Sequence, residues 1–419
     1  DIARRAFRKR GSILEKQGQY DAALAELDRA MAIVNSGAPN LSPLAVPLIS
    51  ADIALVRQRR GEYDLAIAAC EEGLRALRPD DRTRDDDLIE ARLHSVLGGI
   101  YGWRGDYPRA QEHFERSLRV RETVDDLPGV IVSHNNLGYL WQLQSEYERA
   151  LEHYRVAEEL GRKINLRYML VFAANNAAGT LISLGNYGEA EARCVEALKL
   201  SQEMNDRQNI AHIRLTLGFV FYLKGEYAQA LASFEEALRI NRALGSAYQE
   251  ANTLRNIALA LTAQSRFDEA ITTAGQALEG AEALHAEHLK VEALNVLSEA
   301  VIGRHQLAQG QTYAQEAASL SDKIGSKHDS GIARRLLGEI AAAQGQPFGQ
   351  EFDTAVQLFE AIKDRFELAR TWAAYGAALL ETGDKIAARA YLKQAENTFK
   401  DIGANGELRR LAPIVERST

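Results

Sequence analysis

One spacing constrains the fold of this chain more than any other feature: similar residues recur every 40 positions. An aromatic or apolar column contains Tyr147, Tyr187, Tyr227, Phe267 and Leu307, with earlier members Tyr20, Tyr63 and Tyr107 at slightly longer steps. A second column of small residues contains Gly98, Gly138, Ala178, Gly218, Ala258, Ser298 and Gly338, followed by Gly376. A fixed period of this length is typical of a repeat array, in which stacked units bury a shared core.

Each repeat is predicted to be helix, turn, helix. Both segments of a unit carry apolar residues at i, i+3 or i+4, and i+7, and no stretch alternates as a strand would. Small residues at one point of the first helix predict a close approach of two helices. The turns usually contain glycine, which favours the left-handed conformation that ends many helices; these residues are Gly18, Gly61, Gly105, Gly185 and Gly225. About ten such units account for the 419 residues, so we expect a single all-α superhelical domain, 1–419.

Composition excludes several classes of protein. The 50 basic and 58 acidic residues give a net charge of −8, which disfavours general nucleic-acid binding. The longest apolar runs are far shorter than the ~20 residues that span a bilayer, and the start lacks a signal peptide's apolar segment. We therefore expect no membrane contact and a cytoplasmic location. Because the sequence begins at Asp1, inside a predicted helix and without an initiator Met, we also expect a fragment of a longer multidomain protein.

The sequence shows no catalytic or cofactor motif: GxxxxGK[ST], HExxH, GxSxG and GxGxxG do not occur. We therefore predict a non-enzymatic chain with no cofactor and no metal site. The two cysteines, Cys70 and Cys194, fall in an inward-facing column of the second helices and are interpreted as core residues. The acidic run 85–87 is predicted to lie in a solvated charged loop, 78–87.

At this point the columns resemble the tetratricopeptide repeat family. The fourth unit, for example, carries Leu137, Gly138, Trp141, Tyr147, Ala150, Tyr154 and Ala157. The resemblance implies a right-handed αα superhelix of about ten repeats. The family's usual repeat has about 34 residues, and these longer repeats with Asn-rich first helices resemble those of kinesin light chain. They also resemble the C-terminal sensor arms of bacterial STAND-type signalling ATPases, which the links 204–218 and 324–338 resemble more closely.

The resemblance also implies which residues meet a ligand. Counted from the Gly/Ala column, positions −6, −3, −2, +1 and +4 of each first helix, here called the inner columns, would face a concave groove. The candidate binding residues on them are Arg92, Asn135, Asn136, Tyr139, Phe172, Asn175, Asn176, Phe219, Tyr222, Asn252, Arg255, Asn256, Asn295 and Arg335. Paired Asn residues are unusual inside helices. Their amides suit either an extended peptide backbone or hydrogen bonds between neighbouring helices, and both interpretations stay open.

The expected ligand follows from the groove's composition. Aromatic residues in the middle and arginines toward both ends, including Arg5, Arg8 and Arg370, match a ligand with an apolar centre and acidic groups. The preferred function is a protein- or peptide-recognition module, the ligand-sensing arm of a bacterial STAND-type signalling or transcriptional regulator. A static protein scaffold and a receptor arm for a small, sugar-like effector are the alternatives. Neither nucleic acid nor a membrane is an expected partner of this chain.

Overall fold

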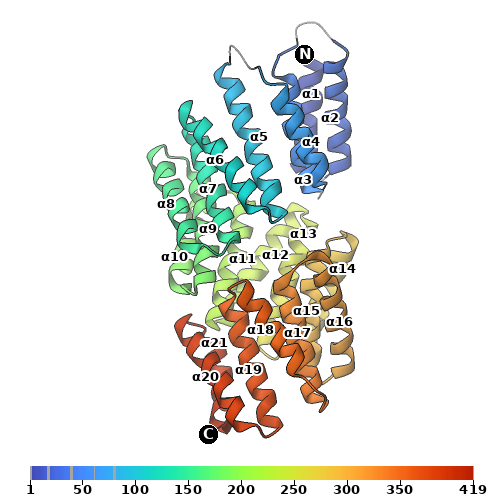
Figure 1. The fold of residues 1–419 in the computed structure, drawn as a ribbon, viewed down its shortest axis with the longest axis vertical. Coiled ribbons are helices and arrows are strands. Elements are labelled where there is room, and N and C mark those ends of the chain that lie inside the picture. Colours follow the sequence, from blue (N-terminus) through green and yellow to red (C-terminus); the bar gives the residue numbers. More distant parts are fainter. Residues whose placement is uncertain (1, 17–18, 38–40, 61, 79–81, 419) are drawn as a thin grey trace. The chain divides into compact units, whose positions relative to one another are not determined.

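The computed structural model describes residues 2–16, 19–37, 41–60, 62–78 and 82–418. Over these residues the chain forms 21 helices and no strand (Figure 1). In chain order they are α1 (Ile2–Lys16), α2 (Tyr20–Asn35), α3 (Ala45–Arg59), α4 (Tyr63–Arg75), α5 (Arg84–Trp103), α6 (Tyr107–Thr123), α7 (Leu127–Leu143), α8 (Tyr147–Lys163), α9 (Arg167–Leu184), α10 (Tyr187–Glu203), α11 (Arg207–Lys224), α12 (Tyr227–Leu244), α13 (Ala247–Ala263), α14 (Phe267–Ala283), α15 (Glu287–Gly303), α16 (Leu307–Ile324), α17 (Lys327–Ala343), α18 (Gly349–Ala361), α19 (Arg365–Glu381), α20 (Lys385–Asp401) and α21 (Asn405–Ser418). Ten helix pairs and a final helix confirm the predicted all-α solenoid.

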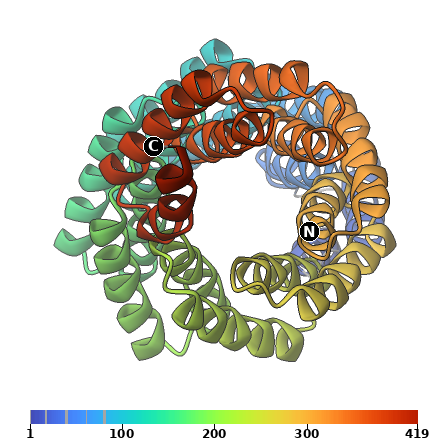
Figure 2. The same ribbon diagram turned by 90° about the horizontal axis from the view of Figure 1, so that it is seen from below.

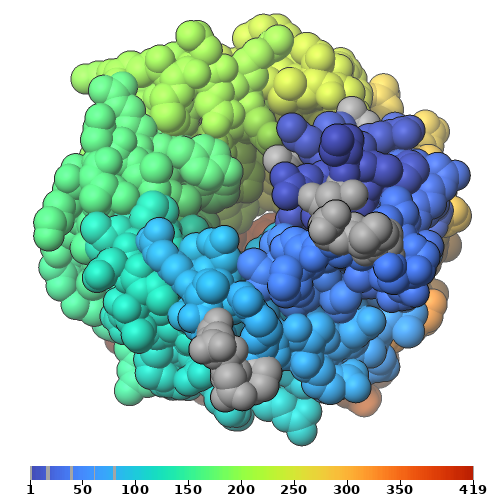
Figure 3. Space-filling view, turned by 90° about the horizontal axis from the view of Figure 1, so that it is seen from above, coloured from blue at the N-terminus to red at the C-terminus, as the bar shows by residue number. Residues whose placement is uncertain are grey.

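The chain divides into two compact units, Asp1–Ala173 and Ala174–Thr419, with the boundary inside α9. Within each unit a helix packs on the next one in sequence, and each first helix also contacts the first helix of the following pair, as α3 contacts α5 and α15 contacts α17. The space-filling view shows the early pairs of unit 1 packed directly against one another (Figure 3, blue to cyan). First helices therefore line one side of each stack, which is where the inner columns lie.

The small-residue column is the point of closest packing inside a pair. A methyl group added to Gly138 would lie 2.6 Å from Cε1 of Tyr154, and one added to Gly218 would lie 2.5 Å from Cε1 of Phe234. The residue sixteen positions later on the second helix thus fills the space that the glycine leaves. Where the column holds Ala258, the corresponding residue is the small Ala274, and both are fully buried in one apolar cluster.

The two cysteines occupy this same second-helix position in other pairs. Cys70 and Cys194 are free thiols, fully buried. Burial raises the pKa of each thiol to about 12, because the apolar surroundings disfavour the thiolate. They act as small core residues, as predicted from the columns.

The turns follow the sequence prediction where the structure describes them. Gly105, Gly185 and Gly225 have φ of +76°, +80° and +78°. Gly18 and Gly61 lie outside the described residues. The prediction of a solvated loop for the acidic run 85–87 is wrong, because these residues form the first turn of α5. Thr83 caps that helix and Asp86 completes the capping box. The Asp86 side chain is buried, and its Oδ2 lies 2.5 Å from Nη2 of Arg78. Carboxylates are favoured at a helix N-terminus.

In each of two successive repeats, a pair of histidines connects the first helix to the second. Nδ1 of His94 on α5 lies 2.9 Å from Nδ1 of His113 on α6, and the same distance separates His134 on α7 from His153 on α8. A hydrogen bond between two ring nitrogens requires one of them to be unprotonated. Burial, and then the neighbouring His113, lower the pKa of His94 to about 4. Burial also lowers the pKa of His113, His134 and His153, which favours the neutral form of both pairs.

Replacing Gly138 with Leu should destabilise the protein by about 1–3 kcal/mol or more, because the new side chain collides with Tyr154. The midpoint of denaturant unfolding measures this loss. Gly275→Leu on α14 is the matched control: it also lies within a helix, but nothing stands within 4 Å of its added methyl group. Equal losses for the two variants would contradict the close-contact explanation.

Lowering the pH from 7 to 5 should destabilise the chain, with His94 contributing on the order of 2 kcal/mol. An unfolded histidine binds its proton near pH 6.5 and the folded His94 only near pH 4. Between these values the unfolded state holds more protons, so the free energy of unfolding falls as the pH falls. His94→Gln should flatten this dependence in urea titrations, and an unchanged dependence in this variant would contradict the role of His94.

Candidate functional site

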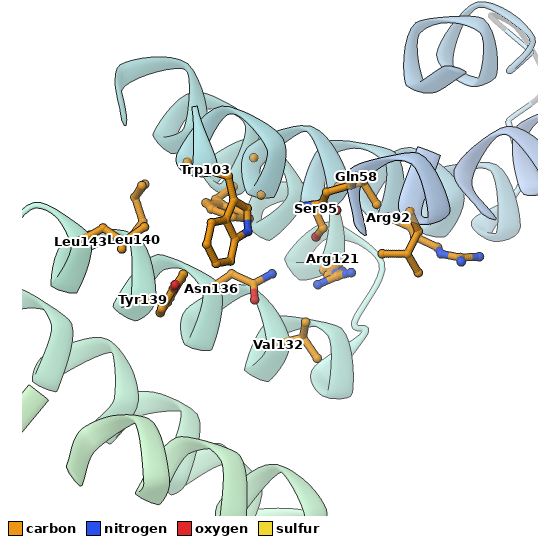
Figure 4. A pocket seen from close by; sticks show the side chains of 16 residues that line it. Gln58, Arg92, Ser95, Trp103, Arg121, Val132, Asn136, Tyr139, Leu140 and Leu143 are labelled. Carbon is orange, nitrogen blue, oxygen red and sulfur yellow. The ribbon is translucent and has the colours of Figure 1, made fainter. Parts of the chain in front are cut away.

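Unit 1 contains an open cavity of about 400 Å³ on its first-helix side (Figure 4). Three successive first helices, α3, α5 and α7, provide most of its surface, and α6 adds two side chains. The lining residues are Leu55, Gln58, Arg92, Ser95, Val96, Gly98, Gly99, Gly102, Trp103, Phe114, Arg121, Val132, Asn136, Tyr139, Leu140 and Leu143. Nine of these, from Arg92 and Val132 at −6 to Gly102 at +4, fill inner-column positions or the glycine column itself. The cavity is therefore built by the repeat register.

An exposed aromatic wall borders one part of the cavity. Trp103 and Tyr139 lie with their ring centroids 6.4 Å apart and tilted by 49°. Trp103 is 63% exposed and Tyr139 and Leu143 are each 37% exposed, which is high for large apolar side chains. Gly99 stands at the +1 position where the next repeat carries Tyr139, and both residues line the cavity. No side chain at Gly99 fills this part of the cavity, where an added methyl group would meet only Gln58.

Two carboxamides lie on the same cavity. Asn136 on α7 and Gln58 on α3 are half-buried. Their side chains make no hydrogen bond within the described part of the chain. Each offers two donors and an acceptor, the set needed to pair with a peptide backbone. Figure 4 shows the Asn136 side chain between the aromatic wall and Arg121.

Two arginines give the cavity a positive end, and none of its lining residues is acidic. Arg92 pairs with Asp52 at 2.5 Å, but Asp52 also binds Arg8, so two guanidinium groups share one carboxylate. Arg121 lies deeper and is only 8% exposed. Its Nη1 donates to the carbonyl oxygen of Gly129 and to Oγ of Ser133, at 2.7 and 2.9 Å.

The charge of Arg121 is poorly compensated. Arg121 forms an ion pair with Asp126, whose carboxylate lies 3.9 Å from Nε. The same carboxylate accepts a hydrogen bond from the backbone amide of Gly129 and so caps α7. Burial lowers the pKa of Arg121, and Asp126 offsets this only in part. Within the described residues, Nε and Nη2 of Arg121 make no hydrogen bond. The guanidinium group retains donors for an anionic group.

Of the candidate binding residues, the structure brings Arg92, Asn136 and Tyr139 together at this cavity. Asn135 is half-buried on α7 and does not line it. Phe172, on the part of α9 in unit 1, packs its ring 4.7 Å from that of Tyr168.

The remaining candidates lie in unit 2. Asn175 is buried on α9, and its Oδ1 has no hydrogen-bond partner among the described residues. Asn176 is half-buried one residue further along the same helix. On α11, Phe219 and Tyr222 stack with centroids 5.9 Å apart, and Tyr222 is buried.

The later asparagines of unit 2 contact their own helices and neighbours. Asn256 donates to the carbonyl oxygen of Asn252 at 3.2 Å, and Arg255 donates to the side-chain oxygens of both. Arg255 also pairs with Glu292 on α15 at 3.0 Å. Asn295 on α15 donates to the carbonyl oxygen of Asp329 on α17 at 3.2 Å. These amides thus bridge within and between first helices.

Arg335 lies in a buried ion cluster formed by the inner columns of α15, α17 and α19. It is 3% exposed and pairs with Glu339 at 2.6 Å and with Glu367 and Glu299 at 3.6 and 3.8 Å. Arg370 completes the cluster, 2.5 Å from Glu299. Burial opposes ionisation of Glu299, but Arg370, Arg335 and Arg410 outweigh it and lower its pKa to about 2. Arg335 is therefore held by protein carboxylates.

The final helix, α21, closes on this part of unit 2. It turns away from α20 and contacts α11 and α19 (Figure 2, dark red). A methyl group added to Gly406 would lie 2.6 Å from Cα of Gly225, so the two backbones touch. Arg409 donates to the carbonyl oxygen of Gly225 at 3.0 Å, and Arg410 lies over the ring of Tyr227, 5.5 Å from its centroid. A segment of the chain itself thus packs against the turn between α11 and α12 in unit 2.

Sequence reasoning missed Gln58, Gly99, Trp103 and Arg121. The signal for two of them was in the columns: the +1 position changes from Gly99 to Tyr139 between successive repeats, and Trp103 ends the helix that carries this gap. Arg121 sits on a second helix and reaches the cavity only through the packing of α6 on α7. No column of the first helices could reveal it.

Two further properties concern the described residues only. No group of three or more His, Cys, Asp or Glu side chains among them is arranged to hold a metal ion. No helix in this part of the chain is long and apolar enough to cross a membrane.

Comparison with known proteins identifies the repeats. The family profile described as tetratricopeptide repeat matches residues 89–163, 170–243 and 209–283. No curated protein matches the chain in sequence.

Solved structures of similar fold include three proteins. The apo form of RapI has a TM-score of 0.60 at 14% identity, over 85% of this chain and 98% of that one. Aspartyl phosphate phosphatase F from Bacillus subtilis has a TM-score of 0.57 at 14% identity, over 88% of this chain and 97% of that one. The Rap conjugation gene regulator of plasmid pLS20, in complex with the Phr* peptide, has a TM-score of 0.51 at 13% identity, over 95% and 95%. Residues 89–163 and 170–283 thus match tetratricopeptide repeats, and the chain shares its fold with these three proteins.

Proposed function

We propose that the chain is a recognition module that binds a linear peptide segment of a protein partner along the inner columns of unit 1. The observation that carries the proposal is the cavity, where an exposed aromatic wall, two unpartnered carboxamides and two arginines meet. Aromatic residues and arginine are the side chains most enriched at binding hot spots. The amides of Asn136 and Gln58 would pair with the backbone of the peptide and the wall would take a side chain. The peptide complex of the Rap regulator of pLS20 supports a ligand of this kind on a similar fold.

The finer proposal is that the chain serves as the ligand-sensing arm of a cytoplasmic STAND-type regulator. Its support is the resemblance of the long repeats and their links to such arms. The open reading frame that contains this chain tests it directly. A nucleotide-binding P-loop domain encoded in the same frame would support the sensor arm, and a frame without one would favour the static scaffold.

Selection of random linear peptides against the full chain, followed by calorimetry with a selected peptide, tests peptide recognition. Asn136→Ala should weaken the affinity about two- to tenfold, since a net hydrogen bond contributes about 0.5–1.5 kcal/mol and 1.4 kcal/mol is a factor of ten. The melting temperature should stay unchanged, because Asn136 makes no bond within the described chain.

Asn256→Ala is the matched control. It removes a hydrogen bond to the backbone of α13, so it should lower the melting temperature and leave the peptide affinity intact. Failure to select any peptide, or an unchanged affinity in the Asn136 variant, would contradict the proposed function.

A further inference from the structure

We infer that the cavity of unit 1 selects a peptide segment in which an aromatic side chain stands next to an acidic residue, with Arg121 donating hydrogen bonds to the carboxylate. This inference rests on the proposed function and adds to it the chemistry of the ligand. It follows from two features that share one cavity: the aromatic wall and the buried guanidinium group.

The aromatic part follows from the shape of the site. Gly99, which has no side chain, and Tyr139 line the same cavity, and Trp103 and Leu143 border it with large exposed surfaces. A flat ring entering this space would stack on Trp103 and Tyr139, and offset or tilted ring pairs stabilise such contacts. A volume of about 400 Å³ suits one large side chain and the residue beside it.

The acidic part follows from the charges. Arg121 is buried, its Nε and Nη2 donate no hydrogen bond within the described residues, and it lies on the same cavity as the wall (Figure 4). A buried cation is stabilised when an anion approaches it, and a carboxylate accepts two parallel hydrogen bonds from guanidinium. Arg92 shares its single carboxylate with Arg8, so the part of the cavity near Arg92 is also positive. An acidic ligand thus meets positive charge from both arginines.

The two requirements apply to one ligand because Asn136 lies between them. A peptide whose backbone pairs with this amide would place successive side chains on either side, toward the wall and toward Arg121. A Phe-Glu or Trp-Asp step meets both, whereas an aromatic residue beside a neutral one leaves the guanidinium group unpaired.

The test uses the full chain and three fluorescein-labelled, capped hexapeptides: Gly-Ser-Phe-Glu-Ser-Gly, its Phe-Gln analogue and its Ser-Glu analogue. Fluorescence polarisation should show the Phe-Glu peptide binding at least about fivefold more tightly than either analogue, since charge-assisted hydrogen bonds are about twice as strong as neutral ones. The advantage over Phe-Gln should shrink as salt is raised.

Variants separate the cavity from other surfaces. Gly99→Leu should abolish the preference for Phe-Glu by filling the cavity. Its fold should survive, because the added methyl group meets only the flexible end of Gln58, at 2.8 Å. Trp103→Ala, at an exposed site, should weaken both aromatic peptides. Tyr248→Ala on α13, at an aromatic residue of similar exposure in unit 2, should change nothing.

Arg121→Met should remove the difference between the Phe-Glu and Phe-Gln peptides. A merely structural role for Arg121 would instead weaken both by the same factor, and that result would overturn the assignment. Equal affinity for Phe-Glu and Phe-Gln, or a preference that persists in Gly99→Leu, would also overturn it. If selected peptides bind without an aromatic–acidic step, peptide recognition stands and this inference fails; if no peptide binds at all, both fail.

Discussion

The close packing of a small residue on a first helix against the side chain sixteen residues later on the second helix recurs in several pairs, and the rest of the structure depends on it. Gly138 accepts Tyr154, Gly218 accepts Phe234, and where the first residue is Ala258 the second shrinks to Ala274. This exchange of volume keeps the two helices at a similar separation while the side chains change, and interiors tolerate changes that conserve volume. Because the contact fixes the rotation of each first helix about its axis, it also determines which positions form the inner columns.

The same columns have different environments in the two units. In unit 1 the +1 position alternates between Gly99 and an exposed Tyr139, and the arginines exceed the carboxylates around them. In unit 2 the +1 positions of α15 and α17 carry Glu299 and Glu339. These carboxylates neutralise Arg335 and Arg370 within the protein. Removing one member of such a buried network leaves an uncompensated charge and is strongly destabilising, whereas an exposed inner-column residue in unit 1 can change at little cost. The scaffold is common to both units, and the cavity that we propose as a binding site lies in the first.

The repeat fold could be predicted from sequence because its determinants are local and recur: helical period, small-residue column, turn glycines. The inner columns then indicated Arg92, Asn136 and Tyr139 correctly as neighbours on one surface. The columns could not show that Arg370 meets Glu299, 71 residues earlier, or that Arg121 reaches the cavity from a second helix. Those contacts depend on the rotation between successive pairs, which no single repeat encodes. The acidic run 85–87 forms the first turn of α5 because it follows the capping residue Thr83. Its charge alone suggests a loop and does not reveal this helix start.

The contact between α21 and α11 changes the mechanics of unit 2. An array whose members touch only their neighbours peels from its end one helix pair at a time. Here Arg409 and Gly406 connect the last helix to the turn after α11. The hydrogen bond from Arg409 to Gly225 joins residues that are 184 positions apart in the sequence. Tension applied at the C-terminus must therefore rupture a long-range joint before α20 and α19 can extend. Once that joint opens, the pairs between it and the end lose their common anchor, so the unit resists small loads as one body and yields abruptly at a larger one.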